Sequence, residues 1–401
     1  MRNDRKYFGF GKNVFVAGLV SFFMDVSSEM IYPLVPLFLA NVLGVNKSVI
    51  GLIEGIAEST ASLLKVFSGW FSDRIGNRKW LMAAGYGIST LSRPIIALAT
   101  DWRHVMGSRL MDRFGKGVRT APRDAIIAES SEKTHLGRAF GFHRSMDTMG
   151  AVVGPALAFF FLGLFSNNYR SVFWLSMIPG AIAVLLIIFF MSEKKKASLP
   201  NSERPKLTLK HFDWRFKFFV AIATLFAIGN SSDVFLILRA QQTGIPIIMI
   251  PVVYLVFNLV YSLSAIPAGI AADRFGKKRV ILLGFILFAF LYYGFAVAKD
   301  TTAIWGLFAI YGLFMGLTEG IQKAFLATII PQDFKATAFG VYNTAVGLAM
   351  FPASLIGGWL WDHVSPSATF YFGAITAGLS AVLFVLFIAV VKRDAPNKIN
   401  I

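Results

Sequence analysis

The chain has 401 residues, of which 56% are hydrophobic and 15% are charged. A soluble domain needs more polar surface than this, so we expect an integral membrane protein. The chain has no cysteine, which excludes disulfides, thiolate catalysis and cysteine metal sites. The net charge of +17 does not indicate nucleic-acid binding, because the basic residues gather between apolar runs, as in the loops of membrane proteins.

About twelve apolar runs are long enough to cross a bilayer, which takes about 20 residues. In chain order they fall near 14–39, 48–72, 79–99, 102–126, 136–164, 170–191, 214–239, 247–272, 279–298, 302–329, 336–361 and 367–391. The first run is too long and too charged for a signal-peptide core, so it counts as a span. Pro33 and Pro36 are expected to bend its outer end. The predicted fold is an all-α membrane protein with twelve transmembrane helices.

Basic residues are unevenly divided between the segments that join these runs. The richest clusters lie at 2–6, 74–79, 194–196 and 277–279. All four segments fall on the same side of a twelve-span chain, and basic loops mark the cytoplasmic side. We therefore expect a multi-pass protein of the inner or plasma membrane, with both termini in the cytoplasm.

The chain divides into two similar halves. The polar stretch 192–213, which contains Pro200 and Pro205, predicts a cytoplasmic linker between a six-helix bundle at 1–191 and another at 214–401. The sequence "GWFSDRIGNRK" at 69–79 recurs as "GIAADRFGKKR" at 269–279, and "SSE" at 27–29 has a counterpart in "SSD" at 231–233. Such a repeat predicts a pseudo-twofold axis along the membrane normal and a binding site where the halves meet.

These repeated motifs resemble those of the major facilitator superfamily over the whole chain. Residues 69–79 and 269–279 resemble its loop 2–3 and loop 8–9 motifs, and Arg113-x3-Gly117-x3-Ala121 resembles its fourth-helix motif. A fifth-helix antiporter motif is resembled by Gly141, Gly150, Gly154 and Pro155, with Ala158 where the family has glycine. The resemblance implies transport by alternating access, export in exchange for protons, no cofactor and a monomer.

The loop motifs are assigned to a gate that closes in one conformation and opens in the other. Asp73 can cap a helix end, and neighbouring basic side chains can reach helix carbonyls or anionic lipid. Gly150 and Gly154 are interpreted as packing residues that let a neighbouring helix approach closely. The residues assigned to the gate are Gly69, Asp73, Arg74, Gly76, Arg78, Asp273, Arg274, Gly276, Arg119 and Arg123.

Charged residues inside the predicted spans are candidates for function, because charge in the bilayer is costly unless it faces protein or water. Asp25, Arg113 and Asp147 lie near mid-depth, and Glu29 lies further out. We expect Asp25 to carry a proton, followed in preference by Glu29 and Asp147, with Arg113 as the counter-charge. The alternative is a buried ion pair that only fixes helix packing, for example Arg113 with Asp25 or Asp147.

A polar and aromatic lining is expected for the substrate cavity. Its predicted members are Tyr32, Glu58, Arg109, His143, Asn230, Asp233, Asn258, Tyr261, Glu319 and Tyr342. The basic face of the fourth span could favour an anionic substrate. No catalytic residue is assigned.

Three functions are consistent with these residues. The first is a proton-coupled exporter of a small organic solute or drug. The second is a divalent-metal exporter, because Asp25, Glu29, His143 and Asp147 could supply oxygen and nitrogen ligands. The third is a membrane enzyme or receptor, for which the sequence offers no nucleophile–base motif and no phosphate loop. The expected partners are the bilayer, protons and a small-molecule substrate, and an enzyme is not expected.

Overall fold

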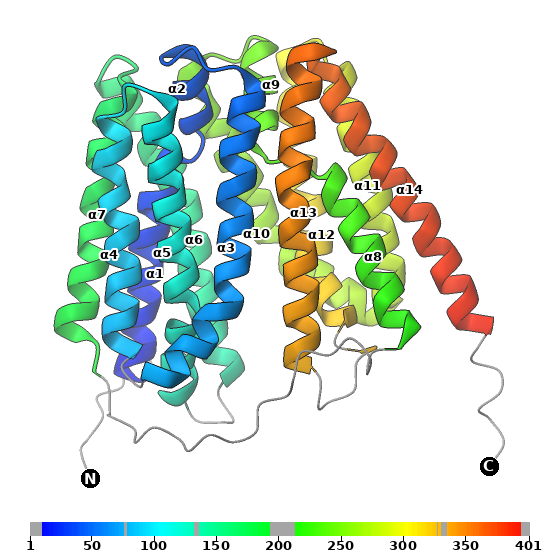
Figure 1. The fold of residues 1–401 in the computed structure, drawn as a ribbon, viewed down its shortest axis with the longest axis horizontal. Coiled ribbons are helices and arrows are strands. Elements are labelled where there is room, and N and C mark those ends of the chain that lie inside the picture. The colour runs from blue at the N-terminus through cyan, green and yellow to red at the C-terminus, as the bar shows by residue number, and fades with distance from the viewer. Residues whose placement is uncertain are drawn as a thin grey trace. The chain divides into compact units, whose positions relative to one another are not determined.

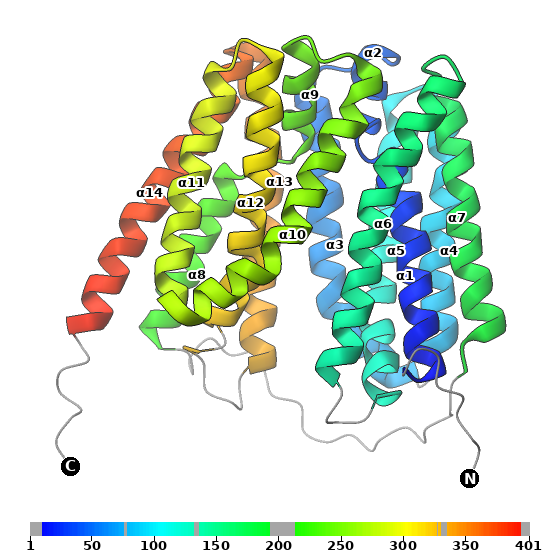
Figure 2. The ribbon, with the colours of Figure 1, turned by 180° about the vertical axis from the view of Figure 1, so that it is seen from behind.

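The computed structural model describes residues 10–75, 78–131, 136–192, 213–326, 328–329 and 335–393, without the side chains at 65–75, 136–138, 266, 335–337 and 392–393. The chain packs into two compact units (Figures 1 and 2). Unit 1 comprises the described residues within Met1–Val45, Ile56–Ser202 and Ile245–Leu255, and unit 2 comprises those within Asn46–Gly55, Glu203–Gly244 and Val256–Ile401.

The described residues form a succession of helices. In chain order these are α1 (Lys12–Ile31), α2 (Val35–Asn41), α3 (Lys47–Ile75), α4 (Arg78–Ala97), α5 (Trp102–Glu129), α6 (Leu136–Leu164), α7 (Tyr169–Phe190), α8 (Trp214–Gly229), α9 (Val234–Gln242), the short 3₁₀ helix η3 (Ile247–Met249), α10 (Ile250–Phe275), α11 (Lys277–Val297), α12 (Thr301–Leu326), α13 (Lys335–His363) and α14 (Pro366–Arg393). Since α1 continues into α2 and α8 into α9 as single spans, the helices correspond to twelve spans, which confirms the predicted fold class.

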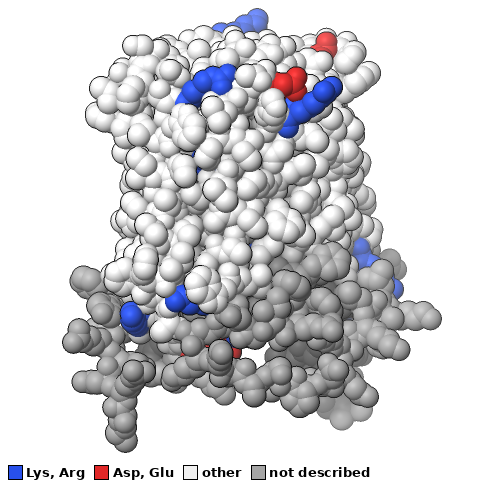
Figure 3. Space-filling view, turned by 60° about the vertical axis from the view of Figure 1, so that its left-hand side comes forward, with Lys and Arg blue, Asp and Glu red and all other residues white. Residues whose placement is uncertain are grey.

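Nine helical segments of the described chain are long and apolar enough to cross a membrane. The second to fourth predicted spans, α3 to α5, fall below that standard because they carry many polar and charged residues. Several of these charged side chains are buried in unit 1, among them Arg93, Asp112 and Arg119. Their charge therefore faces other helices and not lipid. On the face drawn in Figure 3, the visible charged side chains lie mostly above and below a broad band of uncharged residues.

Two spans are interrupted. The first breaks between Ile31 and Val35, where Pro33 lies, so the predicted bend is a change of helix. The seventh breaks between Gly229 and Val234, in the sequence Asn-Ser-Ser-Asp, which contains no proline. The first break follows the "SSE" sequence and the second contains its counterpart "SSD", so the two repeats differ locally.

The interiors of the two units differ in chemistry. In unit 1, α1 packs against α6 and α7, and α4 packs against α5 and α7, around both apolar and charged side chains. In unit 2, α14 packs against α8 and α11 around aromatic rings. The ring of Phe226, for example, lies with its centroid 4.5 Å from that of Phe285 and 4.8 Å from that of Phe288. Aromatic pairs at this distance add to the free energy of apolar burial.

The beginning of α3 belongs to unit 2, where its free backbone N–H groups are satisfied by side chains. The N–H groups of Lys47 and Ser48 donate to the two carboxylate oxygens of Asp362 over 3.2 and 2.6 Å. The hydroxyl of Ser48 donates to the same carboxylate over 2.7 Å, and the N–H of Val49 donates to the Asn46 side chain over 3.0 Å. A carboxylate at this position also complements the positive end of the helix dipole.

Candidate functional site in the charged interior of unit 1

Two carboxyl groups meet between α1 and α6. The side chains of Asp25 and Asp147 lie within hydrogen-bonding distance of each other. The Ser21 hydroxyl donates to Asp147 Oδ1 over 2.6 Å, and the Arg144 guanidinium lies 3.3 Å from Asp147 Oδ2. A hydrogen bond between two carboxyl groups requires a proton on one of them, because carboxylates only accept. This pair can therefore hold one exchangeable proton.

Glycines on α6 allow this close contact. A Cβ atom at Gly150 would lie 2.6 Å from the backbone oxygen of Phe22 and 2.8 Å from the Cβ of Asp25. A Cβ atom at Gly154 would lie 2.7 Å from the Cβ of Glu29. Two glycines of the antiporter-like motif, Gly150 and Gly154, thus face α1 next to Asp25 and Glu29. A Cβ atom at the third, Gly141, would have no neighbour within 4 Å.

We expect Gly150→Ala to lower the thermal stability of the purified protein. The added methyl group meets α1 backbone, and overpacking of this kind costs about 1–3 kcal/mol, more than the roughly 1 kcal/mol that alanine gains over glycine in a helix. Gly141→Ala is the matched control on the same helix, and it should leave the melting temperature unchanged or raise it. Equal melting temperatures for the two variants would show that α1 and α6 are not in tight contact.

Other charged groups surround the carboxyl pair. Lys116 and Arg123 of α5 and Glu29 of α1 are close enough to interact electrostatically with it. Arg123 Nε also donates to Asp124 Oδ1 over 2.9 Å. His143 lies one turn before Asp147 on α6 and is 6% exposed, and its Nε2 has no hydrogen-bond partner among the residues that the structure describes. The carboxyl pair thus has charged groups of both signs around it.

Arg113 lies on α5 and forms an ion pair with Glu58 of α3. The distance from Arg113 Nη2 to Glu58 Oε1 is 2.8 Å, and the two side chains are 9% and 26% exposed. The structure therefore brings Arg113 together with Glu58, whereas the sequence suggested Asp25 or Asp147 as its partner. On the same helix, the Arg109 guanidinium lies 5.5 Å from the ring centroid of Tyr32.

A second buried network was not selected from the sequence. Arg93 Nη2 lies 3.1 Å from Asp112 Oδ1, and both side chains are almost fully buried, at 1% and 6% exposure. Arg93 also donates to the hydroxyls of Ser27 and Ser28 over 3.3 and 2.9 Å. The signal available was the depth of Arg93 within the third predicted span, because a cation there needs a partner. This network joins α1, α4 and α5.

Arg119 extends this buried network along α5. Its guanidinium donates to the Ser89 hydroxyl over 2.7 Å and lies 4.4 Å from the ring centroid of Tyr86. Ser89 in turn donates to the backbone oxygen of Asp112. The structure thus places Arg119, predicted as a gate residue, in contact with α4.

Several of the predicted cavity residues that belong to unit 2 form hydrogen bonds through tyrosine hydroxyls. Tyr311 donates to Asp233 over 2.7 Å, Tyr261 donates to Glu319, and Tyr342 donates to Gln322 over 2.7 Å. In addition, the Tyr292 hydroxyl lies 3.4 Å from the Asn230 side chain, Lys323 lies 3.9 Å from Glu319, and Asn258 is buried.

Part of the predicted gate motif lies outside the described residues. The structure gives no side chains for Gly69, Asp73 and Arg74, which lie on α3, and does not describe Gly76. Arg78 Nη1 lies 2.6 Å from Glu129 Oε1. Lys79 donates over 2.8 Å to the backbone oxygen of Ile188, in the last turn of α7.

The second copy of the motif is described. Lys277 lies 3.2 Å from Asp273, and the Arg274 guanidinium lies 5.6 Å from the ring centroid of Phe275. Gly276 joins α10 to α11 with a φ of +94°, a conformation that glycine adopts at no steric cost. The motif therefore requires glycine here for the backbone turn.

The divalent-metal alternative gains no support from the geometry. Within the part of the chain that the structure describes, no three His, Asp or Glu side chains are grouped so as to hold a metal ion. Asp25, Glu29, His143 and Asp147 all belong to that part.

A helical membrane protein with twelve spans, an internal repeat and a charged interior has the architecture of a membrane transporter. The sequence profile of the Major Facilitator Superfamily matches residues 17–255 and 218–401. The chain belongs to this family, as the motifs predicted.

Relatives and solved structures agree with this assignment. The chain is 36% identical over 392 residues to an uncharacterized MFS-type transporter of Methanocaldococcus jannaschii, covering 96% of each chain. It is 24% identical to a multi-drug resistance efflux pump PmrA homolog of Lactococcus lactis, covering 90% of this chain and 91% of the relative. Its fold is similar to that of a POT family transporter in complex with 5-aminolevulinic acid, with a TM-score of 0.81, 12% identity and 98% of each chain covered.

Proposed function

We propose that the protein exports a small organic solute in exchange for protons, and that Asp25 and Asp147 form the proton-carrying pair. The observation that supports this most is that these two carboxyl groups lie within hydrogen-bonding distance of each other between two membrane-spanning helices. Ionising both would set two negative charges in contact, so the pair favours keeping one proton. Loss of that proton changes the charge inside the bilayer by one unit, where charge is most costly.

The surroundings of the pair suggest separate roles for the two acids. Asp147 accepts a hydrogen bond from Ser21 and lies next to Arg144, and both contacts stabilise a carboxylate. We therefore assign the exchangeable proton to Asp25. When that proton leaves, Lys116 and Arg123 of α5 provide compensating charge, so deprotonation is coupled to the packing of α5 against α1 and α6. Glu29 remains the second candidate for the proton.

The export direction and the substrate class rest on separate support. The antiporter-like residues Gly150 and Gly154 lie against α1 beside the acids, and one relative is named as a multi-drug resistance efflux pump homolog. The tyrosine-held polar groups of unit 2 would suit a molecule with both apolar and polar parts. A monomer in the inner or plasma membrane, with both termini in the cytoplasm, completes the proposal.

Transport by the reconstituted protein tests this proposal. Proteoliposomes with an acidic lumen are given a panel of organic cations and anions, starting with ethidium, and uptake is followed by fluorescence or radiolabel. For a carried solute, uptake should rise well above that without a pH gradient, because protons leaving the lumen drive exchange. Protein-free liposomes with the same gradient are the control. A solute whose protein-dependent uptake is unaffected by the gradient would contradict proton exchange.

A further inference from the structure

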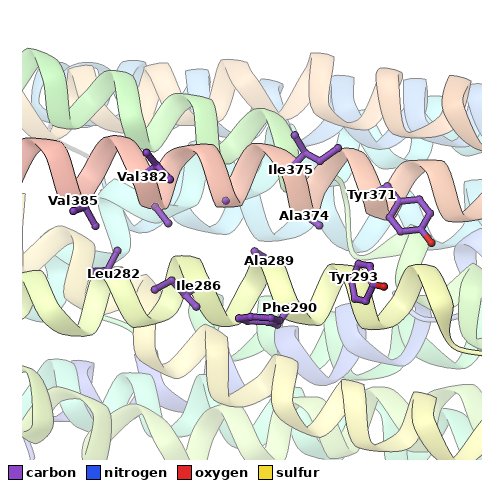
Figure 4. Close-up of a pocket in the computed structure, with 12 residues that line it drawn as sticks. Leu282, Ile286, Ala289, Phe290, Tyr293, Tyr371, Ala374, Ile375, Val382 and Val385 are labelled. Carbon is purple, nitrogen blue, oxygen red and sulfur yellow. The ribbon is translucent and has the colours of Figure 1, made fainter.

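An apolar groove runs along unit 2 between α11 and α14 (Figure 4). It has a volume of about 720 Å³ and is lined from α11 by Leu282, Ile286 and Phe290 and from α14 by Ile375, Gly378 and Val382. Phe290 and Ile375 are 71% and 70% exposed. Because both helices are long and apolar enough to span a membrane, the groove opens to lipid and not to water.

The length of the groove matches one leaflet. On α11 its lining extends from Leu282 to Tyr293, which at 1.5 Å per residue is about 16 Å. Half of the roughly 30 Å hydrocarbon core of a bilayer is about 15 Å. One end is marked by Tyr293 and Tyr371, whose ring centroids are 6.0 Å apart (Figure 4). The groove therefore has about the length of an acyl chain in one leaflet, and because Tyr293 lies four residues before the end of α11 at Val297, it extends past the middle of this span.

The other end of the groove is basic. Lys278 and Arg279 precede Leu282 by four and three residues, so they lie on the same face of α11 as the groove lining. Arg279 is exposed, and Lys278 is close enough to Arg215 of α8 for their charges to repel. Lys277 lies on the opposite face of the helix and pairs with Asp273. Basic side chains at a membrane surface attract anionic lipid headgroups.

We propose that the groove between α11 and α14 binds an anionic phospholipid, with its headgroup on Lys278 and Arg279 and one acyl chain extending towards Tyr293 and Tyr371. Apolar contact alone gives no preference, because neighbouring lipid tails are as apolar as the groove. The basic pair supplies the preference for a negative headgroup, and the groove directs the chain. The proposal does not depend on proton exchange or on the transported solute.

Site-specific fluorescence quenching tests this proposal. The chain has no cysteine, so Gly378→Cys provides a single labelling site, and a Cβ atom there meets open space. The bimane-labelled protein is placed in phosphatidylcholine vesicles that contain a small fraction of phosphatidylglycerol or phosphatidylcholine with brominated chains. We expect brominated phosphatidylglycerol to reach half-maximal quenching at a lower lipid fraction than brominated phosphatidylcholine. The two fractions should differ by about fivefold for each basic side chain that contacts the headgroup. Ile178→Cys, an exposed position in the middle of α7, is the control and should be quenched equally by both lipids.

Two matched double variants then locate the headgroup site. In the Gly378→Cys background, Lys278→Gln with Arg279→Gln should abolish the preference for phosphatidylglycerol. Lys277→Gln with Lys299→Gln removes the same amount of charge at positions outside the groove and should preserve the preference for phosphatidylglycerol. Equal quenching by both lipids at Gly378, or a preference of the same size at Ile178, would overturn the proposal. So would a preference that survives the loss of Lys278 and Arg279. The comparison of the two labelled positions holds whether or not the double variants fold.

Discussion

Asp112→Asn is expected to destabilise the protein by about 3–5 kcal/mol, the range for removing one partner of a buried ion pair. The replacement keeps the shape of the side chain and removes its charge. Asp112 interacts electrostatically with Arg93 and with three further arginines of α5, Arg109, Arg113 and Arg119. Without the carboxylate, these cations repel one another inside unit 1. Thermal unfolding of the detergent-purified variant measures the loss.

Arg93→Met provides the matched comparison. It breaks the same ion pair, but Asp112 keeps three other arginines nearby, and methionine fills much of the space of the arginine stem. We therefore expect a smaller loss of stability than for Asp112→Asn, and the double variant should lose less than the sum of the single losses. A larger loss for Arg93→Met would mean that the hydrogen bonds to Ser27 and Ser28 matter more than the clustered positive charge.

Asp25→Asn is expected to abolish uptake driven by a pH gradient, reducing it to the level of protein-free liposomes. Asparagine is similar in size and can still form hydrogen bonds with Asp147, but it cannot release a proton at neutral pH. Solute exchange without a gradient should continue, because exchange of one solute molecule for another needs no net proton movement. The two assays in the same proteoliposomes separate loss of coupling from loss of the carrier.

Glu29→Gln is the control for this result, because Glu29 lies one turn further along the same face of α1. It should retain gradient-driven uptake. If Glu29→Gln loses this uptake and Asp25→Asn retains it, Glu29 carries the proton and the assignment to Asp25 is wrong. If both variants retain it, neither acid carries the proton.

The fold followed from features that a sequence displays directly. The apolar runs and the repeat at 69–79 and 269–279 predicted twelve spans of the family that the sequence profile then identified. The interruption at 230–233 was not predicted, because it contains no proline. Its Asn-Ser-Ser-Asp sequence was the available signal, since such side chains compete for backbone hydrogen bonds.

The sequence predicted which residues belong to the candidate site better than it predicted which of them pair with one another. Counting from the ends of the predicted spans gave the depth of Asp25, Arg113 and Asp147, and helical spacing gave the residues that share a face, but neither determines how the helices rotate against one another. The contact of Asp25 with Asp147 and of Arg113 with Glu58 depends on that rotation. Among the signals in the sequence, the glycines of α6 came nearest to indicating the first contact, because they mark the face that approaches another helix.

The contact of Asp362 with the start of α3 has a consequence for biosynthesis. Its two ends are separated by 314 residues, from Ser48 to Asp362. At about 5–20 residues per second, a ribosome needs about 15–60 seconds to make the intervening chain. The first turn of α3 is therefore made long before the carboxylate that caps it. Until then water or the translocation machinery must satisfy its N–H groups, and this contact is among the last that the nascent chain can form.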